Sequence, residues 1–338
     1  MSEFEHPSAP QAASAAAHPA TPASHAAGDG QRCSLEPLDP QMTSIQPGGG
    51  WCMSLELAWG GVRRLWLRMF RRGYLARMRE KRRGTPVGVP HDVLDPRDVK
   101  FYRNQGDFGW APADDPFRWR DRLPFARAGL AELLLIGGFF LAATVATGWF
   151  YWPAAPVPAV LMLLVVWFFR DPARRIPNGL GVVVSPADGK VVSIEELEHD
   201  PFIGGPAISI GIFLSIFNVH INRVPIACRV IGMTYHRGKF LNALLEKSTR
   251  ENEQLHIRLE GDEFPHRRMV VKQIAGAIAR RIVCWVRPGE SLARGDQFGM
   301  IKLGSRTELI LPREPGLRIA IRVGQKVAAG ATEMARYE

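Results

Sequence analysis

The stretch FGMIKLGSRTEL, at residues 298–309, places the dipeptide Gly304-Ser305 between two apolar, strand-like runs. Glycine allows the backbone to adopt a strained turn before the serine, because glycine lacks a Cβ atom. In such a turn the Ser305 hydroxyl could attack the Gly304 carbonyl. An ester would form, elimination would break the chain, and the new N-terminus would become a pyruvoyl group. Gly-Ser is also common in ordinary turns, so the dipeptide alone does not decide between the two interpretations.

The same alternation of short apolar runs with glycine and proline continues over the chain from residue 180 onward. Two units of equal form, residues 289–295 and 324–330, each follow a strand-like run and resemble the turns of biotinyl and lipoyl carrier folds. The sequence predicts a mainly β protein with a few helices and a barrel-sandwich-like β core. Helices are expected within this region at residues 239–248 and 274–280. The predicted strands cover residues 181–185, 190–196, 207–215, 227–234, 254–260, 267–273, 281–287, 298–303, 306–311 and 317–322.

An apolar helical hairpin is predicted before the β core, within residues 125–175. Residues 128–149 are apolar apart from Glu132, and this run is long enough to cross a bilayer as a helix. A second apolar run covers residues 153–169, and a cluster of four aromatic residues, 149–152, lies where the two runs meet. Arginines precede the first run and follow the second, which places both ends on the cytoplasmic side of a membrane. The pair either spans the bilayer or enters it partway, and a helical pair buried in a soluble core is the alternative.

The N-terminal part divides into two predicted segments. Residues 1–50 are rich in Ala, Pro, Ser, His and Gly, which predicts a disordered, low-complexity tail and no secretory signal. Residues 51–124 are expected to form a basic amphipathic helix followed by an irregular segment. Within residues 59–84, ten basic residues accompany one acidic residue, and Trp59 and Trp66 belong to an apolar face at helical spacing. This helix either lies on an anionic membrane or packs on the protein itself.

The composition narrows the classes of partner and site. The net charge of +10 and the pI of about 9.8 suit a polyanionic partner, either anionic lipid or nucleic acid. No nucleic-acid-binding fold surrounds the basic segment, so a nucleic-acid partner is not predicted. The four cysteines are widely spaced, and the histidines form no His-x-x-x-His pair. These spacings argue against a metal site and a disulfide framework, and they fit a reducing compartment.

Three motifs give the chain a family resemblance. In order, they are SPADGKVV at residues 185–192, FNVHINRVP at 217–225 and LGSR at 303–306. Together they resemble phosphatidylserine decarboxylase, in its short bacterial branch, over residues 125–338. The segments VVKQIAGAIARR at 270–281 and FFRDP at 168–172 add to this similarity.

The resemblance implies a proenzyme whose β-rich catalytic domain, residues 176–338, cleaves itself between Gly304 and Ser305. The products are a large subunit of residues 1–304 and a small subunit of residues 305–338. It also implies a pyruvoyl cofactor made from Ser305, with neither a metal nor pyridoxal phosphate. The pyruvoyl group would form a Schiff base with the serine amine of phosphatidylserine, and loss of carbon dioxide would give phosphatidylethanolamine.

The resemblance further implies a relay of Asp188, His220 and Ser305. From the residues alone, His220 is a candidate base because a neutral imidazole accepts protons near pH 7. Asp188 is the candidate carboxylate that orients it, although Asp-Gly is also a common turn pair. Arg223 stands where the longer bacterial branch has a second histidine. A guanidinium cannot act as a base at neutral pH, but its planar fork suits a substrate phosphate.

Membrane anchoring fits a lipid substrate, so the expected location is the cytoplasmic face of the cell membrane. The sequence is compatible with a homo-oligomer but does not fix the oligomeric state. Two alternatives remain at this point. One is a pyruvoyl-dependent decarboxylase of another serine-headed lipid or of an amino acid. The other is a non-enzymatic, membrane-tethered carrier-like module.

Overall fold

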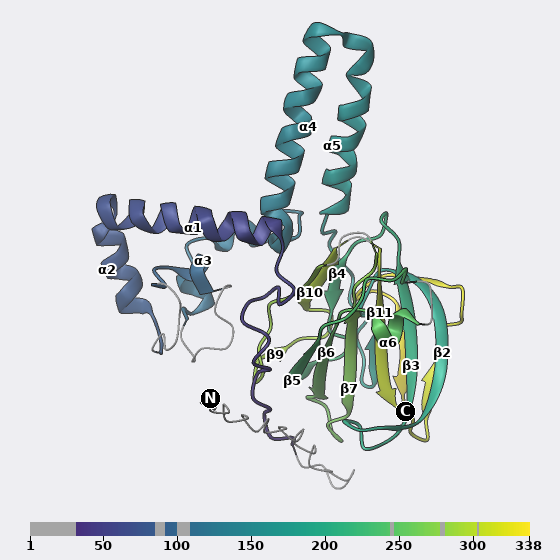
Figure 1. The fold of residues 1–338 in the computed structure, drawn as a ribbon. Helices are drawn as coiled ribbons and strands as arrows, with labels where there is room; N and C mark the ends of the chain where they lie inside the picture. Colours follow the sequence, from purple (N-terminus) through teal and green to yellow (C-terminus); the bar gives the residue numbers. More distant parts are fainter. Residues whose placement is uncertain (1–31, 85–91, 100–108, 244–246, 278–280, 303) are drawn as a thin grey trace, which may run out of the picture.

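The computed structural model describes residues 32–84, 92–99, 109–243, 247–277, 281–302 and 304–338. Figure 1 shows a β core, a long helical hairpin that projects from it, and a helical N-terminal part beside the root of the hairpin. The predicted mainly β fold with an apolar helix before the core is confirmed. The strands are β1 Val182–Val184, β2 Gly189–Asp200, β3 Gly205–Leu214, β4 Ile221–Arg223, β5 Cys228–His236, β6 Gln254–Gly261, β7 Arg268–Ile274, β8 Arg281–Cys284, β9 Ser291–Leu292, β10 Gln297–Lys302, β11 Ser305–Pro312, β12 Leu317–Ile319, β13 Lys326–Val327 and β14 Glu333–Tyr337.

The main sheet has eight strands in the order β13-β2-β3-β11-β7-β6-β5-β9 and curls into a half-barrel. Its two edge strands, β9 and β13, are the middles of the two repeated glycine units. The bounding glycines of both units have positive φ angles, which a residue with a side chain rarely adopts. Each unit therefore folds a two-residue strand onto one edge of the sheet, and such short edges resist pairing with other chains. Two smaller sheets, β1-β14-β12 and β4-β10-β8, complete the core.

The interior is filled by branched apolar side chains from the sheets. Ile210, Ile212 and Leu214 of β3 are fully buried, as are Ile257 of β6 and Phe298 of β10. Burial of each such side chain stabilises the fold by about 1.5–3 kcal/mol. All ten predicted strands coincide with observed ones. The pattern missed β4, β9, β13 and β14, because these strands are short or mix polar with apolar residues.

The two helices predicted inside the β region are wrong where the structure describes them. Residues 239–243 are irregular, and a four-residue helix, α6 Ser248–Glu251, begins only at the end of the predicted range. Ile274 ends β7, and residues 275–277 are also irregular. Ile274 pairs with Arg306 and Gln254 on the neighbouring strands, so sheet pairing outweighs the local helix preference of this Ala-rich stretch. Residues 244–246 and 278–280 lie outside the described residues.

The apolar hairpin consists of α4 Leu130–Phe150 and α5 Pro156–Phe168, with a 3₁₀ turn, η4 Trp152–Ala154, at its tip. The two arms approach each other closely at the root because Gly129 has no side chain. A Cβ atom there would lie 2.1 Å from the Phe169 ring. The Ala126 N–H donates to the Phe169 carbonyl at 2.8 Å and closes the root. Phe168 and Phe169 pack there against the sheet that contains β4, β8 and β10. The hairpin is thus fixed to the small sheet next to Gly304.

The N-terminal part contains α1 Trp51–Phe70, α2 Arg72–Lys81 and α3 Pro96–Val99, followed by the 3₁₀ turns η1 Pro112–Asp114, η2 Arg118–Arg122 and η3 Arg127–Gly129. The predicted disorder does not hold for residues 32–50, which lie along the β core. Met42 is fully buried there, and the Tyr235 N–H donates to the Asp39 carboxylate at 2.8 Å. Apolar burial and these hydrogen bonds offset the entropy of ordering the segment. Residues 1–31 lie outside the described residues.

Candidate active site

Ser305 is the first residue of β11, a central strand between β3 and β7. It pairs with Leu214 of β3 and is fully buried. Within the described part of the chain, its Oγ has no hydrogen-bond partner. A buried hydroxyl without a partner costs free energy, which makes it a candidate for a functional role. Gly304 has a φ of 63°, the left-handed conformation that glycine allows before such a serine.

The Gly304 carbonyl lies against Gly276, which follows β7. A Cβ atom built on Gly276 would lie 1.5 Å from the Gly304 oxygen, so no side chain fits at this position. The carbonyl of the candidate scissile bond is therefore packed against the backbone of a neighbouring segment. This contact brings together two sequence motifs, the one at residues 270–281 and the one at residues 303–306.

His220 is fully buried beside the strand that leads to Gly304. The Ile301 N–H donates to the His220 carbonyl at 3.1 Å, and Ile221 of β4 pairs with Met300 of β10. The His220 ring lies 4.4 Å from the Phe168 ring of the hairpin root, measured between centroids. The loop before β4 and the end of α5 therefore hold the imidazole on two sides.

The tautomer of His220 follows from its hydrogen bond. Its Nδ1 lies 2.8 Å from the Asn218 carbonyl oxygen, which can only accept, so Nδ1 carries the proton. Nε2 is left with a free lone pair, and it is buried with no partner among the described residues. Burial lowers the pKa of His220 to about 4, so the imidazole is neutral at pH 7. These features are those of a base that is ready to accept a proton.

A buried polar network connects the sequence motifs. Asn222 donates to the Pro186 carbonyl at 3.3 Å and to the Thr307 hydroxyl at 3.1 Å, and it accepts a hydrogen bond from Gln273 at 2.9 Å. Asn222, Gln273 and Thr307 are all fully buried. Sequence reasoning missed these three residues. The available signal was a polar side chain on the apolar face of a predicted strand, as at Gln273 between Val271 and Ala275, which lie two residues away on either side.

Asp188 does not contact His220 through any assigned hydrogen bond. Its two carboxylate oxygens each lie 2.9 Å from an Arg174 guanidinium nitrogen, and one also accepts from the Ala329 N–H at 2.8 Å. An arginine is a strong partner for a carboxylate in a partly buried site. In this structure the Asn218 carbonyl occupies the place next to His220 Nδ1 that the relay would give to Asp188. Asp188 precedes β2 and Ser305 starts β11, so the two residues flank opposite sides of β3.

Comparison with known proteins now decides the family. Residues 161–335 match the sequence model of the phosphatidylserine decarboxylase family. A phosphatidylserine decarboxylase proenzyme of Rhodopirellula baltica is 55% identical over 71% of this chain and 99% of that relative. The chain belongs to the phosphatidylserine decarboxylase family. The proenzymes of Syntrophus aciditrophicus and Aromatoleum aromaticum are 41% and 40% identical, over 66% and 65% of this chain and 99% and 95% of those relatives.

In this phosphatidylserine decarboxylase family member, Arg223 is placed away from the buried network. Its guanidinium donates to the Asp171 carboxylate at 3.0 Å and to the Gly295 carbonyl at 2.9 Å. With Arg120 and Arg127 it lines a cavity of about 300 Å³. Three aspartates, Asp121, Asp171 and Asp296, line the same cavity, so its charges are balanced and binding of the substrate phosphate by Arg223 stays a prediction.

The hairpin and the candidate cleavage segment of this family member are joined by a buried ion pair. Lys302, at the end of β10, contacts Glu132 in the first turn of α4. Both side chains are largely buried, and leaving one of them without the other would be strongly destabilising. The one acidic residue that interrupts the apolar run in the sequence is thus used to hold α4 against β10.

The contact between Gly276 and Gly304 leads to a test. Replacing Gly276 with alanine should slow any cleavage at Gly304 by about 10²-fold, because the new methyl group displaces the carbonyl and small displacements of reacting groups have effects of this size. The fraction of cleaved chain can be followed on denaturing gels after pulse labelling. Gly205→Ala is the matched control, since a Cβ at Gly205 meets nothing within 4 Å. Equal cleavage of the two variants would contradict the steric account.

Proposed function

We propose that the chain is a proenzyme that cleaves itself between Gly304 and Ser305 and then converts phosphatidylserine to phosphatidylethanolamine. The observation that carries this proposal is that Ser305 Oγ and His220 Nε2 are both buried without a hydrogen-bond partner among the described residues, and that Ser305 directly follows Gly304 with its positive φ. The names of the relatives, which are phosphatidylserine decarboxylase proenzymes, support both parts of the proposal.

The cleavage chemistry uses groups of this chain. The Ser305 hydroxyl gives its proton to a base, and its oxygen attacks the Gly304 carbonyl carbon. The C–N bond breaks, the nitrogen takes a proton, and an ester joins Gly304 to the Ser305 side chain. Loss of the Ser305 α-proton then expels the Gly304 carboxylate. Addition of water with release of ammonia leaves a pyruvoyl group on residue 305.

His220 is the proposed base for the first of these steps. Its Nε2 lone pair is free, and the Nδ1–H bond to Asn218 fixes the ring. Burial holds its pKa low, which disfavours a persistent imidazolium, so the proton is passed on to the departing nitrogen.

The residues fit a pyruvoyl group at position 305, because Ser305 Oγ is buried, has no partner in the part of the chain that the structure describes and lies at a strand start next to a glycine. Such a group supplies an electrophilic carbonyl for the serine amine and an electron sink for decarboxylation. His220 and Phe168 pack ring against ring at the hairpin root, and the buried network of Asn222, Gln273 and Thr307 keeps the start of β11 in place.

The proposal includes membrane association through the α4–α5 hairpin, on the cytoplasmic face of the cell membrane. Within Arg127–Phe150, an 18-residue stretch has a mean hydropathy of 2.0, and 11% of that stretch is buried inside the protein. The 21 residues of α4 extend over about 31 Å, close to the thickness of a bilayer's hydrocarbon core. Trp149 and Trp152 at the tip are highly exposed and suit a membrane–water interface. Anchoring of this kind would bring the site at the hairpin root to the surface where the substrate's head group lies.

Intact-mass analysis of the purified full chain under denaturing conditions tests the proposal. We expect two fragments, residues 1–304 and 305–338, the smaller of which begins with a pyruvoyl group and has no free amine. The same preparation should release carbon dioxide from phosphatidylserine in vesicles and not from free serine. A single unbroken chain that is fully active would overturn the proposal, and release from free serine would instead support an amino-acid decarboxylase.

A further inference from the structure

The helix α1 has an exposed apolar stripe that no part of the described chain covers. Its members recur every three or four residues, so at about 100° per residue they share one side of the helix. Trp59 is 66% exposed, Trp66 48% and Met69 53%. The stripe consists of Trp51, Leu55, Trp59, Val62, Trp66, Met69 and Phe70. A solvent-exposed stripe of seven apolar side chains, three of them tryptophans, indicates an interaction site.

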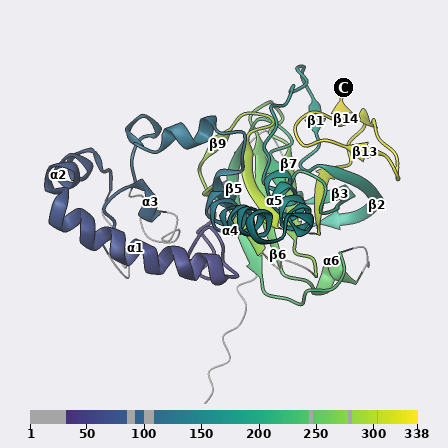
Figure 2. The ribbon, with the colours of Figure 1, turned by 90° about the horizontal axis from the view of Figure 1, so that it is seen from above.

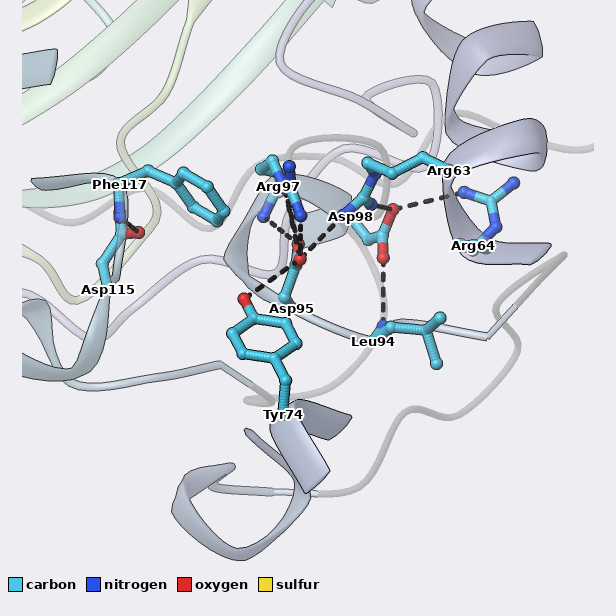
Figure 3. A network of polar contacts seen from close by, with 9 residues as sticks. All are labelled: Arg63, Arg64, Tyr74, Leu94, Asp95, Arg97, Asp98, Asp115 and Phe117. Atoms are coloured by element: carbon cyan, nitrogen blue, oxygen red, sulfur yellow. Dashed lines mark hydrogen bonds and ion pairs between the residues drawn. The ribbon is translucent and has the colours of Figure 1, made fainter. Parts of the chain in front are cut away.

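The polar side of α1 is the side that packs on the protein. Arg63 contacts the buried carboxylates of Asp95 and Asp98, and Arg64 contacts Asp98 at 3.2 Å (Figure 3). Leu67 is buried on the same side of the helix. Tyr74 of α2 and Arg97 of α3 also bond Asp95, so the three helices are tied together (Figure 3). This docking fixes the rotation of α1 and leaves the aromatic stripe facing outward.

The orientation of the apolar stripe can be described relative to the α4–α5 hairpin. In Figure 1, α1 runs sideways from the hairpin root, while α2 and α3 lie on the side of α1 away from the hairpin. Figure 2 looks along the hairpin, whose helices appear end-on while α1 lies lengthwise. Trp51 at the start of α1 and Ile136 of α4 line the same cavity, so the two helices meet. If α4 enters a bilayer, α1 therefore lies along its surface with the stripe toward the lipid.

The charges near α1 favour an anionic bilayer as the partner of the apolar stripe. Arg63 and Arg64 are paired with aspartates, but Arg71 and Arg72 at the junction with α2 are exposed. Arg77 and Arg79 of α2 are exposed as well. An anionic bilayer attracts such a group, whereas a second copy of the same basic surface would repel it. The pattern of an aromatic face beside arginines is typical of interfacial helices.

We infer that α1 is an interfacial helix that binds an anionic bilayer beside the hairpin, so that two elements hold the protein at the membrane. The inference rests on the membrane association in the proposed function and not on its chemistry. α1 lies outside residues 161–335, the part that matches the family model.

Hydroxyl-radical footprinting of the full chain, read by mass spectrometry, tests this inference. The chain is compared in three settings: lipid-free amphipol, nanodiscs of phosphatidylcholine, and nanodiscs that also contain phosphatidylglycerol. We expect oxidation of Trp59, Trp66 and Met69 to fall several-fold in nanodiscs relative to amphipol, with the larger fall when phosphatidylglycerol is present. Phe264 is the internal control. It is 78% exposed in the turn between β6 and β7, at the far end of the sheet from the hairpin root.

A pair of matched variants sharpens the result. Trp59→Glu combined with Trp66→Glu should abolish the protection of Met69, and Phe264→Glu should leave it intact. Equal oxidation of Met69 in amphipol and in both nanodiscs would overturn the inference. Protection in amphipol that grows with protein concentration would also overturn it, because a second copy would then cover the stripe. Trp149 reports hairpin insertion in the same samples, and no readout requires turnover, so failure of the proposed decarboxylation would be seen separately.

Discussion

Replacing Ser305 with alanine should leave the chain in one piece and reduce carbon dioxide release from phosphatidylserine to background. The methyl group of alanine has no oxygen to attack the Gly304 carbonyl, and no other route to a pyruvoyl group exists at this position. The fold should survive, because the Ser305 Oγ makes no hydrogen bond within the described chain and its removal leaves no described group without a partner. Denaturing gels, intact mass and carbon dioxide release together measure the effect.

Ser209→Ala is the matched control for this prediction. Ser209 is a largely buried serine on β3, the strand that pairs with β11, and it lies opposite Ile310. The same chemical change there should leave cleavage and activity near the unsubstituted level. Normal decarboxylation by the Ser305→Ala chain would refute self-cleavage as the source of activity.

Replacing His220 with glutamine should slow cleavage by about 10²–10⁴-fold, the usual contribution of a general base. Glutamine can keep a hydrogen bond to the Asn218 carbonyl but has no group that accepts a proton at neutral pH. Chains synthesised in a cell-free system and sampled over time give the rate. His256→Gln is the control, since the pKa of His256 is also lowered by burial, but His256 is only half-buried and lies on β6 with Gln254 as its partner.

The pH profile of cleavage distinguishes a base from a structural histidine. Burial lowers the pKa of His220 from the usual 6.5 of a histidine to about 4, so Nε2 is unprotonated above that pH. The cleavage rate of the unsubstituted chain should therefore be flat around neutral pH and fall only as the pH drops toward about 4. The slow residual cleavage of His220→Gln should lack this fall. A decline centred near the usual histidine pKa of about 6.5 would show that the reacting histidine is solvated, against the structure.

The strands and the hairpin were predictable because their signals are local. The alternation of apolar residues in runs such as 207–215 follows from the two-residue repeat of a strand, and the apolar length of 128–149 follows from the rise of a helix. The Ala-rich stretch 274–280 misled the prediction because its end belongs to a sheet whose partners lie elsewhere in the chain. Met42 was assigned to a disordered tail for the same reason, since its partners come from the distant β core.

The amino-acid sequence by itself determined the mainly β class, the apolar hairpin and the basic helix, and it singled out the Gly304-Ser305 bond as the proposed reactive position. These depend on periodicity, length and the chemistry of neighbouring residues, all of which are written along the chain. Only the tertiary structure decided that Gly276 packs on the Gly304 carbonyl, that His220 bonds Asn218 while Asp188 bonds Arg174, and that α1 turns its aromatic side outward. Such contacts depend on strand register and on the competition among distant partners, and no local pattern encodes that competition.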